Sequence, residues 1–218
     1  LSTFELMWDD FYTLITTANA AKRAAPLPVG APLYALVEAL GADPESDPGK
    51  FEQILADAIA DGLATDAVIA QSGADRERLW AVREDLNEPM ASIWPLFAFD
   101  VSVAVSAMEA FVAEAKAGVA ARFPGACFVT YGHIGDGNLH LMVGIGSADG
   151  DTHHAVDTAV FEVVQRFGGS ISAEHGVGTA KREYLGYSRT PAEMALMRAL
   201  KAAVDPGNIL NPGKIFPA

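Results

Sequence analysis

One ten-residue segment, Tyr131-Gly-His-Ile-Gly-Asp-Gly-Asn-Leu-His140, constrains the fold more than any other part of the chain. It contains the pair Asp136-Gly137 between two apolar runs, and this pair is the strongest short signal for a two-residue β-hairpin turn, because both turn positions need positive φ. With these two residues as the turn, His133 lies opposite His140. The sequence therefore predicts a hairpin that places two imidazoles on one face of a sheet, with Cβ atoms about 5 Å apart.

Two histidines placed in this way can bind one divalent ion such as Zn²⁺ or Mn²⁺, although a single strand histidine more often only occupies a sheet surface. A second segment, residues 170–178, places Glu174 and His175 next to each other between glycines. Glu174 can complete a two-histidine, one-carboxylate site that leaves coordination positions open for a substrate. We therefore predict a metal site of His133, His140 and Glu174, with His175 available as the general base.

The rest of the chain alternates short strands with helices, which predicts an α+β fold. We expect an antiparallel or mixed sheet with helices on one face, in a ferredoxin-like layer that is loosely duplicated along the chain. The predicted strands are 33–40, 66–70, 97–103, 127–134 and 138–145, and the predicted helices are 4–20, 51–61, 75–87, 105–123, 154–167 and 191–204.

The same pattern predicts three segments along the chain. Residues 1–30 read as a helical lead-in and linker, and residues 31–168 as the α+β substrate and metal domain. Residues 169–218 read as a Gly-rich active-site loop, a helix and an irregular Pro/Gly tail.

Charge and cysteine content exclude several classes of protein. The 218 residues include 15 Lys and Arg but 28 Asp and Glu, and the net charge of -13 argues against nucleic acid or an anionic membrane as partner. The longest apolar runs, 93–99 and 104–108, are far shorter than the roughly 20 residues that span a bilayer. The single cysteine, Cys127, cannot form an internal disulfide, so we expect a buried thiol in a cytoplasmic protein.

Three motifs together resemble the C-terminal domain of the FAD-linked oxidases of the vanillyl-alcohol oxidase superfamily, in the branch of D-lactate and D-2-hydroxyglutarate dehydrogenases and the flavin subunit of glycolate oxidase. They span residues 132–140, 169–176 and 205–214, in the family's order and spacing. The resemblance implies FAD held mainly by an upstream domain, and a C-terminal tail whose Asn211 and Lys214 return toward that cofactor. It also implies the metal and base roles derived above.

A fourth match, Leu79-Trp-Ala-Val-Arg-Glu84, concerns the substrate. The resemblance assigns Arg83 to the substrate carboxylate and Asn87 to the same binding site. Without it, Arg83 would be interpreted as a solvated helix charge, because charged residues surround it. Planar, bidentate pairing of a guanidinium with a carboxylate suits the functional interpretation.

Two positions depart from the pattern of the D-2-hydroxyglutarate enzymes. Ala98 stands where those enzymes carry Lys, and Met142 stands where they carry Asn. Met142 is expected on the same hairpin face as His133 and His140, so the change would fall within the pocket. Leaving a second substrate carboxylate without polar partners is costly. The sequence therefore favours D-lactate or another 2-hydroxy acid with a less polar tail.

We accordingly predict the substrate- and metal-binding domain of an FAD-dependent D-2-hydroxy-acid dehydrogenase, which oxidises the acid to a 2-oxo acid. Its expected partners are the small acid, an FAD domain and an electron acceptor that the sequence does not identify, with homodimerisation left open. Two alternatives remain. A metal-dependent hydrolase would be active with metal alone, whereas a non-catalytic metal-binding module would bind metal without responding to 2-hydroxy acids.

Overall fold

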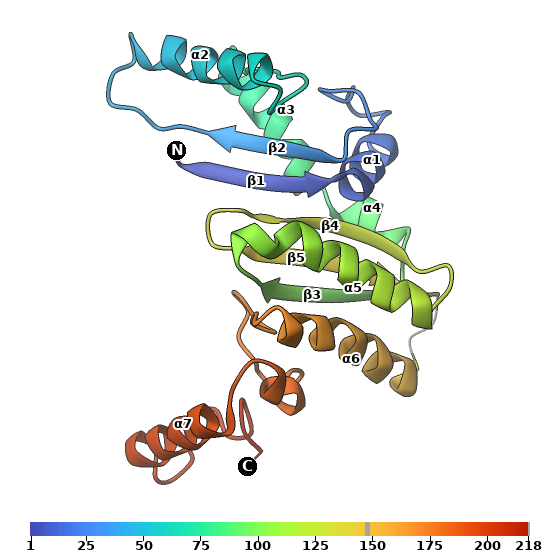
Figure 1. The fold of residues 1–218 in the computed structure, drawn as a ribbon, viewed down its shortest axis with the longest axis vertical. Coiled ribbons are helices and arrows are strands. Elements are labelled where there is room, and N and C mark those ends of the chain that lie inside the picture. The colour runs from blue at the N-terminus through green and yellow to red at the C-terminus, as the bar shows by residue number, and fades with distance from the viewer. Residues whose placement is uncertain (147–148, 218) are drawn as a thin grey trace. The chain divides into compact units, whose positions relative to one another are not determined.

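The computed structural model describes residues 1–146 and 149–217. The chain divides into two compact units, Leu1–Ser92 and Ile93–Ala218, a boundary that the sequence analysis does not place (Figure 1). Each unit combines helices with antiparallel strands, which confirms the predicted α+β class. Among the described helices, none is long and apolar enough to cross a membrane.

The N-terminal unit is built on two antiparallel strands. β1 and β2 pair over their whole length, with Phe4 opposite Val37. The helix after β1 buries Phe11 and Ile15 completely. The unit comprises β1 (Thr3–Trp8), α1 (Asp9–Ala18), β2 (Leu33–Glu38), α2 (Asp47–Ala60), α3 (Gly73–Glu84) and α4 (Asn87–Ala91).

The sequence analysis is wrong about two elements of this unit and misses a third. The predicted helix 4–20 begins as strand β1, and only its second half is helical. Pairing with β2 decides the conformation of the first residues, while Asp9 and Asp10 mark the true helix start, where negative charge is favourable. The described residues 66–70 form no strand, because no neighbouring strand pairs with them, and α4 was not predicted.

The C-terminal unit contains three antiparallel strands in the order β4-β5-β3. A single antiparallel bridge joins Ser102, at the end of β3, to Ser170. The succession strand, helix, two strands, helix and bridge matches the predicted ferredoxin-like order, with the fourth strand reduced to that bridge. The unit comprises β3 (Leu96–Ser102), a 3-10 turn (Val105–Ala107), α5 (Met108–Arg122), β4 (Cys127–His133), β5 (Asn138–Gly144), α6 (Gly150–Arg166), a 3-10 helix (Arg182–Tyr187) and α7 (Pro191–Val204).

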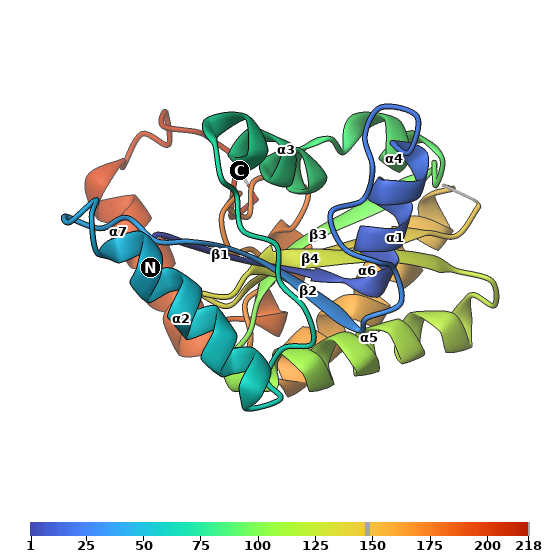
Figure 2. The same cartoon turned by 90° about the horizontal axis from the view of Figure 1, so that it is seen from above.

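The three strands of this unit have two chemically different faces. Helices α5 and α6 lie side by side on one face, as the two views show (Figure 2). Phe99 packs edge-on against Phe161 of α6, with ring centroids 5.5 Å apart, so the odd-numbered residues of β3 point into the apolar core. Because successive strand residues alternate, the even-numbered residues of β3 and β5, including Asp100 and His140, lie on the other face.

The predicted hairpin exists, but its predicted register is wrong. Tyr131, not His133, lies opposite His140, and the loop spans residues 134–137. Of the two expected turn residues only Gly137 has positive φ, at 77°, while the carboxylate of Asp136 accepts the N–H of Asn138 at 3.0 Å. This side-chain hydrogen bond supports a longer loop. The shift amounts to two residues, so both histidines keep the same face.

Cys127 also differs from the prediction. Its side chain is exposed at the start of β4, where its thiol donates to the carbonyl of Gly144 at 3.4 Å. The expected burial of the thiol is therefore wrong.

The C-terminal segment has the predicted irregular loop, helix and tail. α7 begins with a capping box between Thr190 and Glu193, which satisfies free N–H groups of the first turn. The tail then folds back, since Ile215 donates its N–H to the carbonyl of Gly178 at 3.0 Å. The predicted Gly-rich loop is therefore held between β3 and the tail.

Candidate metal and substrate site

The structure brings the three predicted metal ligands together. His133 ends β4, His140 lies in β5, and Glu174 belongs to the loop that follows the Ser170 bridge. The Nε2 atoms of the two histidines are 3.5 Å apart, and Oε1 of Glu174 is 3.4 Å from Nε2 of His133. One ligand atom from each residue lies within 4.8 Å of the others. No other group of this kind occurs in the part of the chain that the structure describes.

These separations fit a divalent ion. Tetrahedral ligands about 2.1 Å from Zn²⁺ are about 3.4 Å apart, close to the two shorter separations in this cluster. Two nitrogens and one carboxylate oxygen also form a donor set that Zn²⁺ and Mn²⁺ accept. The three residues can therefore hold the ion that the sequence predicts.

Buried polar atoms beside the histidines support the same conclusion. Asn138, which lies opposite His133, has neither its amide oxygen nor its amide nitrogen hydrogen-bonded among the described residues. Oδ1 of Asp100, which lies opposite His140, likewise has no partner there. Buried polar groups are nearly always satisfied in proteins, so this face is suited to bind polar ligand atoms.

His175 lies beside the cluster. Its side chain is 67% exposed, its Nδ1 is 3.5 Å from Oδ2 of Asp100, and its ring centroid is 6.3 Å from that of His140. The negative charge of Asp100 favours a proton on Nδ1, which leaves the lone pair of Nε2 available. This arrangement is the one that a general base requires.

Asp100 is a residue of this site that the sequence analysis missed. Its Oδ2 accepts the backbone N–H groups of Ala173, Glu174 and His175 at 3.2, 3.0 and 3.1 Å. Burial raises the pKa of Asp100, but the N–H groups of His175 and Glu174, together with the nearby His175 ring and Lys181 ammonium, outweigh it and lower the pKa below its usual value. A lone Asp in the apolar strand Leu96–Ser102 was the signal that could have revealed it.

Comparison with known proteins identifies the family. Residues 1–215 match the sequence profile described as FAD linked oxidases, C-terminal domain. The chain belongs to this family. D-2-hydroxyglutarate dehydrogenase of Stutzerimonas stutzeri is 44% identical over 226 residues, which cover 100% of this chain and 47% of that protein. D-2-hydroxyglutarate dehydrogenase of Xanthomonas citri is 44% identical over 160 residues, which cover 71% of this chain and 34% of that protein.

Among solved structures, 4-ethylphenol oxidase from Gulosibacter chungangensis superposes on this FAD-linked oxidase domain with a TM-score of 0.55. The alignment covers 99% of this chain and 48% of that chain, at 16% sequence identity. It therefore supports a shared fold. The chain spans about half the length of the Stutzerimonas relative.

Ala98 and Met142 occupy opposed positions in this FAD-linked oxidase domain. They form a directly facing pair between β3 and β5, one pair away from Asp100 and His140. Ala98 is exposed and Met142 is half-buried. The two apolar side chains therefore lie together, on the strand face that carries the predicted metal ligands His133 and His140.

Arg83 and Asn87 belong to the N-terminal unit of the domain. Nε of Arg83 lies 2.9 Å from Oε2 of Glu5, and the two side chains are only 11% and 8% exposed. The interpretation of Arg83 as a solvated charge is therefore wrong, since it forms a largely buried ion pair. Asn87 is exposed at the first position of α4. Their predicted roles in substrate binding stay predictions.

Asn211 and Lys214 lie in the exposed tail of the domain. Asn211 adopts positive φ, at 49°, and its carbonyl accepts the N–H of Lys214 at 3.3 Å, which closes a tight turn. Their predicted role toward FAD stays a prediction.

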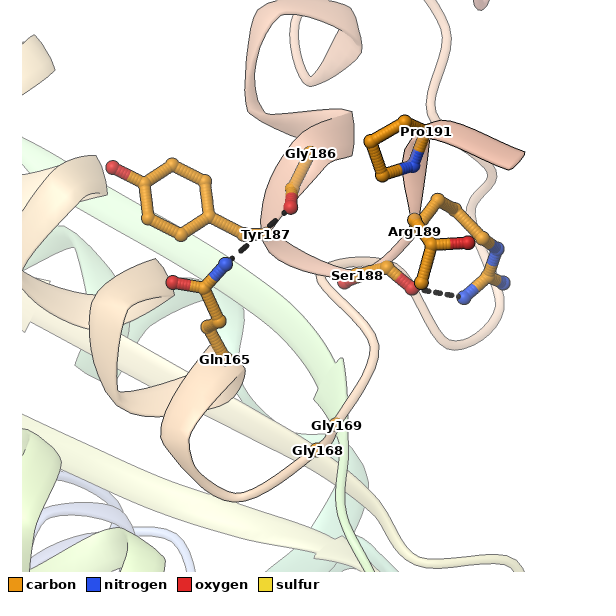
Figure 3. A pocket seen from close by; sticks show the side chains of 9 residues that line it. Gln165, Gly168, Gly169, Gly186, Tyr187, Ser188, Arg189 and Pro191 are labelled. Carbon is orange, nitrogen blue, oxygen red and sulfur yellow. Dashed lines mark hydrogen bonds between the residues drawn. The ribbon is translucent and has the colours of Figure 1, made fainter. Parts of the chain in front are cut away.

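A shallow pocket elsewhere in the C-terminal unit contains none of the predicted site residues. It lies between Gly168, Gly169 and residues 186–191, and Gln165 donates to the carbonyl of Gly186 across one side of it (Figure 3). Arg189 donates to the carbonyl of Ser188 within the same wall. The predicted site residues of this unit therefore lie outside this pocket.

Proposed function

We propose that this domain binds substrate and metal in an FAD-dependent D-2-hydroxy-acid dehydrogenase, which oxidises a 2-hydroxy acid to a 2-oxo acid. The observation that carries the proposal is the convergence of His133, His140 and Glu174, with His175 next to them. Two relatives named D-2-hydroxyglutarate dehydrogenases support the reaction class. The proposal requires FAD bound by another region and an electron acceptor, whereas homodimerisation is left open.

Each residue of the site has a distinct proposed role. His133, His140 and Glu174 would hold a divalent ion, Zn²⁺ or Mn²⁺, and would orient the substrate at the strand face opposite α5 and α6. When bound, this ion supplies Lewis acidity to the substrate hydroxyl and carboxylate, and FAD supplies the hydride acceptor. His175 takes the hydroxyl proton on Nε2, because Asp100 favours a proton on Nδ1.

We further propose that the substrate carries an apolar tail, with D-lactate or an aliphatic D-2-hydroxy acid favoured. The facing pair Ala98 and Met142 presents no cation and no amide to a distal carboxylate. An enzyme specific for D-2-hydroxyglutarate needs polar partners for that group, since an unpaired buried charge is costly.

The experiment that tests the function is a dye-reduction assay of the intact protein with FAD, run over a panel of D- and L-2-hydroxy acids before and after treatment with a chelator. Reduction that depends on a D-2-hydroxy acid and on the metal supports the proposal. A metal-dependent hydrolase would instead act on esters or amides without FAD. A metal-binding module would bind the ion yet reduce no dye with any acid of the panel.

A further inference from the structure

The loop that carries Glu174 and His175 is attached to β3 by one buried carboxylate. Asp100 is only 4% exposed, and its Oδ2 accepts the N–H groups of the three consecutive residues from Ala173 to His175. Successive N–H groups that converge on one oxygen form a compact anion-binding arrangement, and a charged acceptor makes such bonds about twice as strong as neutral ones. These contacts define the backbone direction at Glu174.

Lys181 attaches the far end of the same loop. Its Nζ donates to the backbone carbonyl of Asp100 at 3.3 Å and to Oγ of Ser172 at 3.4 Å. The near end is held by the bridge between Ser102 and Ser170, whose N–H groups and carbonyls pair at 2.8 and 3.0 Å. The loop is therefore joined to β3 before, at and after the residue that contributes the carboxylate ligand.

Asp100 also lies directly opposite His140 across the β3–β5 pair. The backbone of Asp100 pairs with that of His140, and its carboxylate accepts the backbone N–H of Glu174. The described group of residues able to hold a metal comprises His133, His140 and Glu174 and does not include Asp100. Its side chain is thus engaged with the loop backbone.

We propose that Asp100 is a positioning residue for the metal site, which acts through the backbone of Glu174 to place that carboxylate within reach of the two histidines. The inference rests on the proposed metal-binding function. Residues that orient metal ligands typically change metal affinity by about 10–100-fold when they are replaced. Asp100→Asn keeps the size of the side chain and one acceptor oxygen but removes the charge that strengthens the three hydrogen bonds.

Asp205 offers a matched control in the same unit. Its carboxylate accepts the N–H groups of Ile209 and Leu210 at 3.0 and 2.9 Å and pairs with Lys201, so it also holds a loop through backbone donors and a lysine. That loop contributes no ligand to the metal cluster. Asp205→Asn should therefore leave metal affinity unchanged while weakening a comparable anchor.

The test is a double-mutant cycle on metal affinity, measured by titrating Zn²⁺ and Mn²⁺ separately into the metal-free intact protein. Asp100→Asn alone should weaken binding by about 10–100-fold. In a Glu174→Ala background the same change should have an effect of less than about threefold, because the ligand it positions is gone. Asp205→Asn should not alter affinity in either background.

Equal losses from Asp100→Asn with and without Glu174 would overturn the proposal, because Asp100 would then act directly on the ion or on the histidines. Unchanged affinity in Asp100→Asn would overturn it as well. Thermal melting of each variant separates these results from unfolding.

If Asp100→Asn does not fold, Lys181→Gln provides the second variant. Lys181→Gln should weaken metal binding when Glu174 is present and should have no effect in the Glu174→Ala background. If His133→Ala binds Zn²⁺ and Mn²⁺ as tightly as the wild type, the metal site itself is refuted, and the positioning role with it.

Discussion

We predict that the choice of substrate depends on two side chains that face each other, Ala98 and Met142. Directly opposed residues have Cβ atoms about 4.5–5.5 Å apart, so both can reach the same distal group of a bound acid. A hydrogen bond to a charged group is worth on the order of 2 kcal/mol, and 1.4 kcal/mol corresponds to tenfold, so each missing contact costs about thirtyfold in selectivity. We expect D-lactate or an aliphatic D-2-hydroxy acid to exceed D-2-hydroxyglutarate in kcat/KM.

The double change Ala98→Lys with Met142→Asn should narrow this gap. Ala98 is exposed, so a lysine there has room and little effect on folding, whereas Asn at the half-buried Met142 exchanges apolar contact for a polar group. The assay compares kcat/KM for both acids in the wild type, the single variants and the double variant. A control exchange at an exposed position of α5, Glu109→Gln, should leave the ratio unchanged.

A wild-type preference for D-2-hydroxyglutarate would refute this reasoning, since the distal carboxylate would then be bound by residues other than this facing pair. A double variant with an unchanged ratio of kcat/KM values would refute it equally, because the pair would not contact the substrate tail.

Three further predictions concern the metal, an ion pair and pH. His140→Ala should strongly weaken metal binding in calorimetry while His153→Ala, at an exposed position of α6, should not; equal losses would show that the metal lies elsewhere. Arg83→Met should destabilise the protein to denaturant by about 3–5 kcal/mol because it breaks the largely buried ion pair with Glu5; an exposed, weak pair would show a loss below about 1 kcal/mol. The hydrogen bond from Lys201, followed by that from the N–H of Leu210, lowers the pKa of Asp205 to about 2. The contribution of Asp205 to the stability of the fold should therefore be present above about pH 4 and be lost as the pH falls toward 2. The melting temperature of Asp205→Asn should vary less over that pH interval than the melting temperature of the wild type.

Local sequence patterns determined most of the helices and the strands of the C-terminal unit, and they predicted a candidate ligand set whose members the structure brings together. α7 spans the predicted residues 191–204. His133 and His140 share a face as predicted although the predicted strand register is wrong, because a register shift of two residues leaves each side chain on the same face of the sheet. Such properties depend on neighbours a few residues away, which the sequence displays directly.

Tertiary structure decided the features that depend on distant partners. The first residues are a strand because β2 pairs with them, and Arg83 is buried because Glu5 lies beside it. The loop that carries Glu174 has its position because Asp100, far away in the sequence, accepts its N–H groups. Neither periodicity nor turn chemistry specifies which separated residues meet, because backbone pairing, burial and hydrogen bonding across the fold are satisfied together only when the whole chain is packed.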